Sequence, residues 1–280
     1  MKILFCGDLV GRAGRDVTLE HLPILRAEMG LDFVVVNAEN AAHGFGLTQK
    51  ICEELFEAGA DAITTGNHVW DQREVISFID ADPRVLRPLN YTSGTPGRGA
   101  SVIKARDGRS VLVVNVMCRL FMELLDDPFA AVENVLKSHA LGKTVDAALF
   151  DVHGEATSEK MALGHVCDGR ASLVVGTHTH IPTADAQVLP GGTAYQTDAG
   201  MCGDYDSVIG MLKETAIAKF RTKIVTERLA PARGPASLCG VYVETDDTTG
   251  LAARVAPLVL GGRLRPAWPD FLPPRGMAAE

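Results

Sequence analysis

The sequence predicts an α/β protein built on a parallel β-sheet that is covered on both faces. In the first 80 residues, three short apolar runs alternate with segments of helical periodicity, as in sheets with helical connections. The runs are almost continuously apolar, which is expected of strands buried on both sides. Each run ends in polar residues, and ligands of such sheets bind beyond the carboxyl ends of the strands.

The expected elements follow this alternation along the chain. The first three strands are predicted at residues 2–6, 33–36 and 62–65, with helices at 17–29, 51–59 and 72–79. Residues 100–105 and 110–116, joined through Asp107-Gly108, are typical of a hairpin. The remaining helices are expected at 128–140, 158–166 and 214–220, and the remaining strands at 147–152, 171–175, 186–189, 193–197, 237–244 and 252–260. We expect one domain over residues 1–265 and a proline-rich tail over 266–280.

Composition and charge exclude several classes of protein. A balance of 27 Lys and Arg against 35 Asp and Glu gives a net charge of −8, so we expect no broad nucleic-acid surface. The six cysteines are scattered without a CxxC pair, which favours reduced thiols over a disulfide framework. The first apolar run is too short for a signal peptide, and no run reaches the ~18 residues of a membrane span. These observations predict a cytoplasmic protein.

The motif Gly176-Thr177-His178-Thr179-His180 follows the apolar run 171–175. In an extended segment, residues i and i+2 point the same way, so both imidazoles are expected to face one spot. Imidazole nitrogen suits transition metals, and the pair therefore indicates a metal site. On this pattern alone, two ordinary histidines at the end of a strand remain the alternative.

Other candidate ligands stand at the predicted strand exits. The full set is Asp8, Glu39, Asn40, Asn67, His68, His153, His178 and His180. So many donors exceed the three or four that one zinc needs, and they favour two ions about 3.5–4 Å apart that share a carboxylate. Nitrogen and oxygen donors without thiolate favour Fe, Mn, Zn or Co. Singly, Asp8 could instead cap a helix, and Asn67 could be a turn residue. The early glycines have the wrong spacing for a dinucleotide-binding GxGxxG loop.

At these residues the chain resembles the calcineurin-like metallophosphoesterase family. The resemblance rests on Asp8, on Gly66-Asn67-His68 and on the His178/His180 pair. Two departures, Val10 in place of a usual His and Glu39-Asn40 in place of a bridging Asp, are similar to the YmdB-type branch. The motifs of that branch recur in order as Gly7-Asp8…Gly11, Asn40-Ala41-Ala42-His43-Gly44, Gly66-Asn67-His68, His153-Gly154-Glu155-Ala156-Thr157-Ser158-Glu159-Lys160 and Gly176-Thr177-His178-Thr179-His180.

The resemblance implies a sandwich of two mixed β-sheets flanked by helices, with a binuclear metal site at the C-terminal ends of strands. Glu39 would bridge the two ions, and Asn40 would replace the imidazole missing at Val10. The ions implied are iron or, alternatively, manganese. One ion would be held by Asp8, Glu39, Asn40 and His180, and the other by Glu39, Asn67, His153 and His178.

The same resemblance implies a reaction and a catalytic residue. A metal-bridging hydroxide would hydrolyse cyclic nucleotides of the 2′,3′-cyclic AMP type and generic phosphodiesters, and His68 would protonate the leaving oxygen. His68 could instead only orient a water or a phosphate oxygen. A phosphomonoesterase or nucleotidase on the same site, and a regulatory nucleotide- or metal-sensing protein with little turnover, stay open as alternatives. The expected partner is a small phosphodiester or cyclic nucleotide, and family likeness points to a homo-oligomer.

Overall fold

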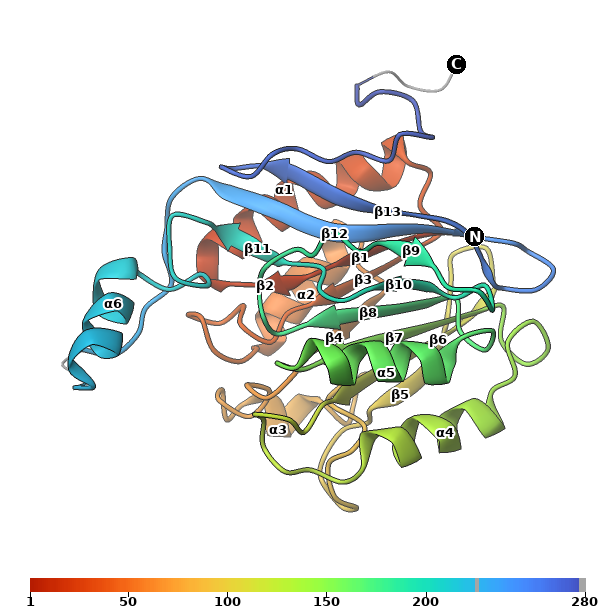
Figure 1. Ribbon diagram of the computed structural model, residues 1–280, viewed down its shortest axis with the longest axis horizontal. Coiled ribbons are helices and arrows are strands. Elements are labelled where there is room, and N and C mark those ends of the chain that lie inside the picture. The colour runs from red at the N-terminus through yellow and green to blue at the C-terminus, as the bar shows by residue number, and fades with distance from the viewer. Residues whose placement is uncertain (225–226, 277–280) are drawn as a thin grey trace.

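Two β-sheets pack face to face in the computed structural model, which describes residues 1–224 and 227–276 (Figure 1). The first sheet has the strand order β2-β11-β12-β1-β3-β4, and β13 pairs with β12. β1, β3 and β4 are parallel, whereas β12 runs antiparallel to both β1 and β13. These strands are β1 Lys2–Cys6, β2 Asp8–Leu9, β3 Phe33–Asn37, β4 Ala62–Thr64, β11 Met201–Asp204, β12 Ala236–Thr245 and β13 Ala252–Gly261.

The second sheet has the strand order β5-β6-β7-β8-β10-β9. Its four central strands are parallel, and each edge strand is antiparallel to its neighbour. The expected hairpin is confirmed as the β5/β6 pair. The strands are β5 Ala100–Lys104, β6 Ser110–Met117, β7 Ala147–His153, β8 Leu173–Thr177, β9 Gln187–Val188 and β10 Ala194–Gln196.

Side chains alternate between two apolar layers along the strands. Ile3 and Phe5 of β1 belong to the layer between the sheets, whereas Leu4 and Cys6 face the helices on the outside. Residues of one strand point alternately to opposite faces, so burial on both sides requires an unbroken apolar run. The apolar runs in the sequence thus follow from the sandwich.

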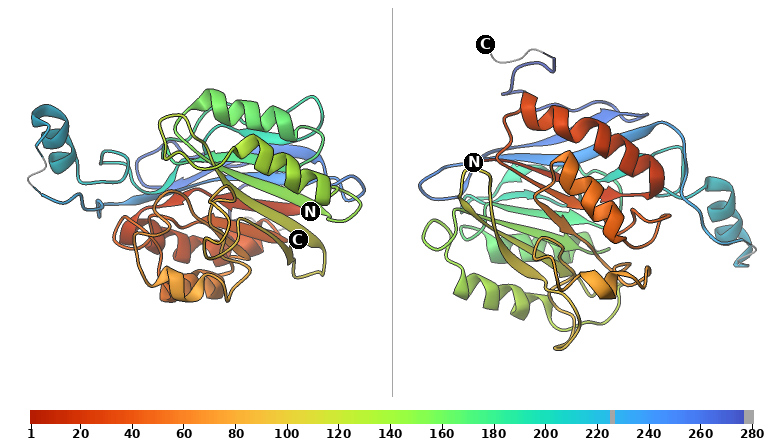
Figure 2. Two further views of the ribbon diagram at one scale, coloured as in Figure 1. Left: turned by 90° about the horizontal axis from the view of Figure 1, so that it is seen from below. Right: turned by 180° about the vertical axis from the view of Figure 1, so that it is seen from behind.

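Helices cover the outer face of each sheet, as the edge-on view of Figure 2 makes clear. α1, α2 and α3 pack on the first sheet, and α4 and α5 pack on the second. α6 extends away from the body, and only Ala216 of this helix is buried. The helices are α1 Gly11–Glu28, α2 Gln49–Ala58, α3 Val75–Phe78, α4 Pro128–Ser138, α5 Thr157–Cys167 and α6 Lys213–Thr222. None of the helices in the described part of the chain has both the length and the apolar character of a membrane span.

Two expectations from the sequence need correction. The strand–helix alternation alone predicts one parallel sheet between layers of helices, and this is wrong, because each sheet has helices on one face and the other sheet on its second face. The apolar pattern of a strand is the same in both arrangements. The helix expected over 72–79 is confined to Val75–Phe78, because bends and turns occupy residues 71–74 and a turn begins at Ile79. The two-sheet sandwich implied by the family resemblance is confirmed.

Candidate metal centre

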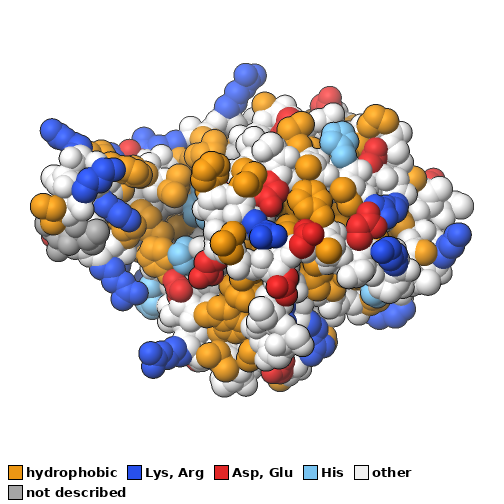
Figure 3. All heavy atoms as spheres, turned by 60° about the horizontal axis from the view of Figure 1, so that its bottom comes forward, with side chains coloured by type: hydrophobic (Ala, Val, Ile, Leu, Met, Phe, Trp, Pro, Cys, Tyr) orange, Lys and Arg blue, Asp and Glu red, His pale blue; other side chains and the backbone are white. Residues whose placement is uncertain are grey.

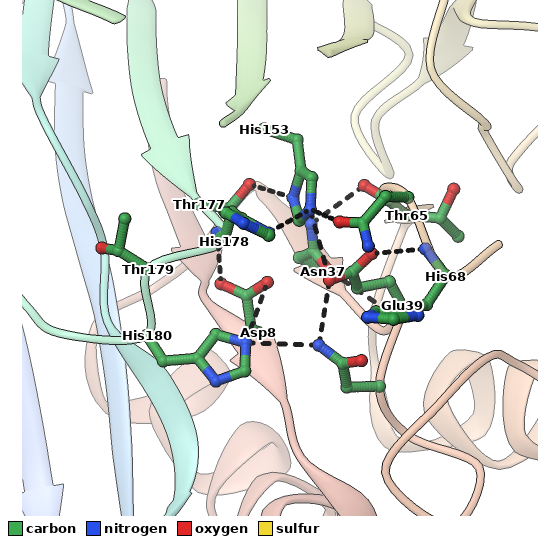
Figure 4. Close-up of polar contacts among 12 residues, drawn as sticks. Asp8, Asn37, Glu39, Thr65, His68, His153, Thr177, His178, Thr179 and His180 are labelled. Atoms are coloured by element: carbon green, nitrogen blue, oxygen red, sulfur yellow. Dashed lines mark hydrogen bonds and ion pairs between the residues drawn. The ribbon is translucent and has the colours of Figure 1, made fainter. Parts of the chain in front are cut away.

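The eight predicted site residues meet at one edge of the sandwich, and both sheets contribute to them (Figure 4). Asp8 lies in β2, and His153 is the last residue of β7. The others stand on the segments that follow β3, β4 and β8, namely Glu39, Asn40, Asn67, His68, His178 and His180. Parallel strands bring their carboxyl ends to a common edge, and the face-to-face packing brings the two edges together.

The first group of donors is Glu39, His153 and His178. Nε2 of His153 lies 3.3 Å from Oε1 of Glu39 and 3.2 Å from Nδ1 of His178. Oδ1 of Asn67 lies 2.9 Å from the same nitrogen of His153. Three acceptor atoms therefore surround Nε2 of His153.

The second group is Asp8, Glu39 and His180. Nε2 of His180 lies 3.8 Å from Oδ1 of Asp8 and 3.2 Å from Nδ2 of Asn40. The amide of Asn40 also donates to Oε1 of Glu39 at 2.9 Å. Within each group the candidate ligand atoms lie within 4.8 Å of one another, and Glu39 belongs to both groups.

The donor set fits cations. Asp8 and Glu39 are fully buried carboxylates, and Oδ1 of Asp8 and Oδ1 of Asn40 have no hydrogen-bond partner in the described structure. Buried acceptors without a donor are costly unless a positive charge satisfies them. Gly66 leaves the necessary room, since a Cβ at this position would overlap Nε2 of His153 and Oε2 of Glu39. The site can therefore hold metal ions between Asp8, Glu39 and the imidazoles.

The charges of the site shift its pKa values in opposite directions. Burial raises the pKa of Asp8 to about 7, although His180 and His153 oppose the shift. Burial also acts to raise the pKa of Glu39, but the charge of His153 and its hydrogen bond outweigh it and hold that pKa well below its ordinary value. Burial acts to lower the pKa of His153, yet Glu39 and Asp8 raise it to about 9. Burial and the neighbouring His153 lower the pKa of His178 to about 3, so this ring is neutral. Without a cation, a proton on His153 supplies positive charge to the site.

A buried polar chain orients His153 from behind. Its Nδ1 donates to Oγ1 of Thr177 at 2.9 Å, and that hydroxyl donates to Oδ1 of Asp151 at 2.6 Å. Asn37 and Thr64, from the first sheet, donate to Oδ2 of the same carboxylate. Asp151 therefore links the two sheets under the site and leaves Nε2 of His153 free to face Glu39.

The His178–His180 segment is a turn and is not an extended strand end. φ is +92° at His178 and +68° at His180, a region that non-glycine residues rarely adopt. The expectation that both rings face one spot through strand alternation is therefore wrong, since His178 joins the first group and His180 the second. Nδ1 of His180 donates to the carbonyl of Ile209 at 2.8 Å, which directs its Nε2 toward Asp8.

A buried ion pair fixes this turn. Nζ of Lys160 donates to the carbonyl of Thr177 at 2.7 Å and lies 2.8 Å from Oδ2 of Asp198. The Asp198 carboxylate also accepts bonds from the backbone N–H and hydroxyl of Thr179 and from the N–H of Gly200. Lys160 and Asp198 are both fully buried, so they hold the strained turn between the two histidines.

His68 stands at the rim of the site. Its backbone N–H donates to Oε2 of Glu39 at 3.1 Å, and its Nδ1 lies 2.9 Å from Oδ2 of Asp71. The ring contacts the edge of Phe45, and 30% of the His68 side chain is exposed to solvent. A histidine in this position can reach a bound substrate while its backbone is fastened to the buried donors.

Sequence reasoning missed the supporting residues Asp151, Thr177, Lys160 and Asp198. Lys160 is the last residue of the motif that begins at His153, and Thr177 lies within the His178 motif. The sequence therefore contained both residues within recognised motifs, but it did not indicate that they support the site. Asp198 lies 38 residues from its partner Lys160 and had no signal of its own.

The two-sheet sandwich and its shared carboxylate, amide and imidazole site define a phosphoesterase of the calcineurin-like metallophosphoesterase class, and the prediction of an enzyme of this class is confirmed. A model of the YmdB-like protein family matches residues 4–258, and the chain belongs to that family. The chain is 47% identical over 260 residues to a 2′,3′-cyclic-nucleotide 2′-phosphodiesterase of Bacillus subtilis, covering 93% of this chain and 97% of that protein.

Two solved structures share the fold. A hypothetical protein from Thermus thermophilus is 43% identical, with a TM-score of 0.87, and the match covers 94% of this chain and all of that one. A phosphatase from Mycoplasma pneumoniae is 33% identical, with a TM-score of 0.86, and the match covers 93% of each chain.

Proposed function

We propose that this protein is a metal-dependent phosphodiesterase that hydrolyses 2′,3′-cyclic nucleotides and other small phosphodiesters. The observation that carries the proposal is the pair of donor groups that share Glu39 at the open edge of the sandwich. Similarity to the Bacillus subtilis enzyme over nearly the full chain supports the choice of substrate. A net charge of −8 supports a small substrate over a long nucleic acid.

In this proposal seven residues hold two ions. Glu39 belongs to both sets. The first set adds a carboxylate, an amide and one imidazole, and the second adds an amide and two imidazoles. One set is Asp8, Glu39, Asn40 and His180, and the other is Glu39, Asn67, His153 and His178. Iron is the first choice and manganese the second, as the family resemblance implies, and nitrogen and oxygen donors without thiolate suit both ions.

The chemistry of a phosphodiester explains why such a site is needed. Its negative oxygens repel a nucleophile, and its alkoxide is a poor leaving group. Bound metal ions supply charge neutralisation and make water acidic enough to react near neutral pH. Asp8 and Glu39 offset about two of the roughly four positive charges of two divalent ions, so the site still attracts an anion.

His68 has the role of general acid. In a 2′,3′-cyclic nucleotide, a water molecule that gives up a proton adds to phosphorus and the bond between phosphorus and O2′ breaks. O2′ takes a proton from His68, and the phosphate stays on O3′. Asp71 lies 2.9 Å from Nδ1 of His68, which leaves Nε2 as the atom that faces substrate. General-acid catalysis by a positioned imidazole contributes about 10²–10⁴-fold to the rate.

Hydrolysis of 2′,3′-cyclic AMP by the His68→Ala variant tests the proposal. We expect the wild type to form 3′-AMP, and we expect the rate to fall at least ~100-fold in the variant with the metal content unchanged. His165→Ala is the matched control, because His165 is an exposed histidine of α5 outside the site. A variant that keeps the wild-type rate contradicts the acid role, and a wild type without turnover favours the sensing alternative.

A phosphomonoesterase is the second candidate, and the description of the Mycoplasma pneumoniae relative as a phosphatase favours it. Release of inorganic phosphate from 3′-AMP would support this candidate. Accumulation of 3′-AMP from the cyclic substrate would contradict it.

We also propose a cytoplasmic homo-oligomer. All six cysteines are free and buried, which supports a reducing compartment. Ile217 and Phe220 on the protruding α6 are exposed apolar side chains, and a second copy of the chain would cover them. Light scattering should give a multiple of the 29.8 kDa chain mass, and Phe220→Ala should lower it. A monomeric wild type would contradict this proposal.

A further inference from the structure

Residues 118–126 form a loop whose ends are fixed to buried side chains. The amide of Asn90 donates to the carbonyls of Met117 and Asp126, at 2.9 Å each. The carboxylate of Glu159 accepts the N–H groups of Arg119 and Leu120 at 2.9–3.0 Å. Both Asn90 and Glu159 are buried, so the loop has a rigid base.

The tip of this loop is apolar and exposed. Phe121 is 89% exposed, Leu124 is 80% exposed and Leu120 is 51% exposed. Phe121 also has a φ of +63°, which is unfavourable for a bulky residue. A solvent-exposed phenyl ring on a strained backbone contributes little to the free energy of folding. Such a residue points to a role in binding.

The loop adjoins the candidate metal centre. The N–H of Cys118 donates to the carbonyl of His153 at 2.8 Å, and Phe121 follows only three residues later, within about 11 Å of Cys118. The segment after His153 touches both features, since Glu155 lies 3.4 Å from His178 and Glu159 holds the loop. Figure 3 shows hydrophobic side chains gathered beside histidines on this face of the molecule.

The charge of the loop selects which part of a substrate it can meet. The loop carries Glu123 and Asp126 against the single cation Arg119, and Asp127, the N-cap of α4, follows directly. This net negative charge beside the apolar tip disfavours phosphate and anionic lipid surfaces. It tolerates a flat, uncharged ring, and every nucleobase offers a face that stacks on an aromatic side chain.

We propose that Phe121, supported by Leu124, is the subsite for the nucleobase of the cyclic nucleotide. This rests on the proposed phosphodiesterase function, in which the cyclic phosphate lies at the metal centre and the base extends outward from the ribose. Stacking does not read hydrogen-bond patterns, so the subsite accepts adenine, guanine, cytosine and uracil, with purines favoured by their larger face.

The test compares two cyclic phosphates, 2′,3′-cyclic AMP and glycerol 1,2-cyclic phosphate, which has no base. Phe121→Ala should raise KM for 2′,3′-cyclic AMP by about 5- to 100-fold and leave turnover of the glycerol ester unchanged. Phe121→Tyr should restore the wild-type KM, and Phe121→Leu should not, because leucine is apolar without a π-face. Ile24→Ala is the control for loss of an exposed apolar side chain elsewhere, on α1 and outside both the site and the protruding α6.

Three results would overturn the inference. They are an unchanged KM for 2′,3′-cyclic AMP in Phe121→Ala, an equal loss on both substrates, and a change in molar mass that accompanies the loss, which would assign Phe121 to a protein interface. A wild type inactive on both esters contradicts the proposed function instead. In that case, equilibrium binding of 3′-AMP tests the subsite separately. If the inference is right, Phe121→Ala weakens this binding.

Discussion

Replacing Lys160 by methionine should destabilise the fold and loosen metal binding together. The substitution keeps the apolar stem but removes the partner of Asp198 and the donor to the Thr177 carbonyl. Breaking one side of a buried pair costs about 3–5 kcal/mol, because an uncompensated charge stays behind. Asp198 keeps its donors from Thr179 and Gly200, which places the expected loss near 3 kcal/mol. For a chain of this size, that lowers the melting temperature by about 5 °C.

The assay is thermal and urea unfolding in the presence of a chelator, followed by titration with Mn²⁺. Lys160 is bound to the turn that carries His178 and His180, so we expect the affinity for Mn²⁺ to fall about 10- to 100-fold. Lys213→Met is the matched control, because its ion pair with Asp206 has the same 2.8 Å distance and is solvent-exposed, and it should change neither quantity. A Lys160→Met variant that loses less than ~1 kcal/mol and keeps its metal affinity would refute the reasoning.

Two further predictions concern metal binding. Protons compete with metal for His153 and Asp8, whose pKa values are raised to about 9 and about 7, so affinity for Mn²⁺ should rise steadily from about pH 6 to pH 9. Calorimetric titration should record proton release at pH 7, and an affinity that does not change with pH would contradict this. Gly66→Ala should abolish metal binding, because the added Cβ overlaps His153 and Glu39, while circular dichroism of the chelated protein stays as in the wild type. Full metal content in this variant would show that the ligands can move apart.

Much of the site could be predicted because parallel strands end at a common edge. Asp8 and His153 lie in β2 and at the end of β7, Asn67 follows β4, and the structure brings all three to the site that shares Glu39. The local conformation of the histidine pair could not be predicted in this way. The left-handed φ values of His178 and His180 depend on Lys160 and Asp198. Lys160 lies in α5, and Asp198 lies on the segment that follows β10.

The periodicity of apolar residues also could not predict that the strands divide between two sheets. Phe33 and Val35 alternate with Val34 and Val36 in the same way whether helices or a second sheet cover the inner face. Only the family resemblance distinguished the two arrangements. The contact between Asp151 and Thr64 joins the sheets under the site, and no spacing in the sequence indicates it.

Anomalous diffraction at the iron and manganese edges, from crystals of protein purified without added metal, tests the central claim most directly. The claim predicts two peaks per chain, one among Asp8, Glu39 and His180 and the other among Glu39, His153 and His178. Crystals with no peak at these residues, or with a single peak that does not touch Glu39, would contradict it.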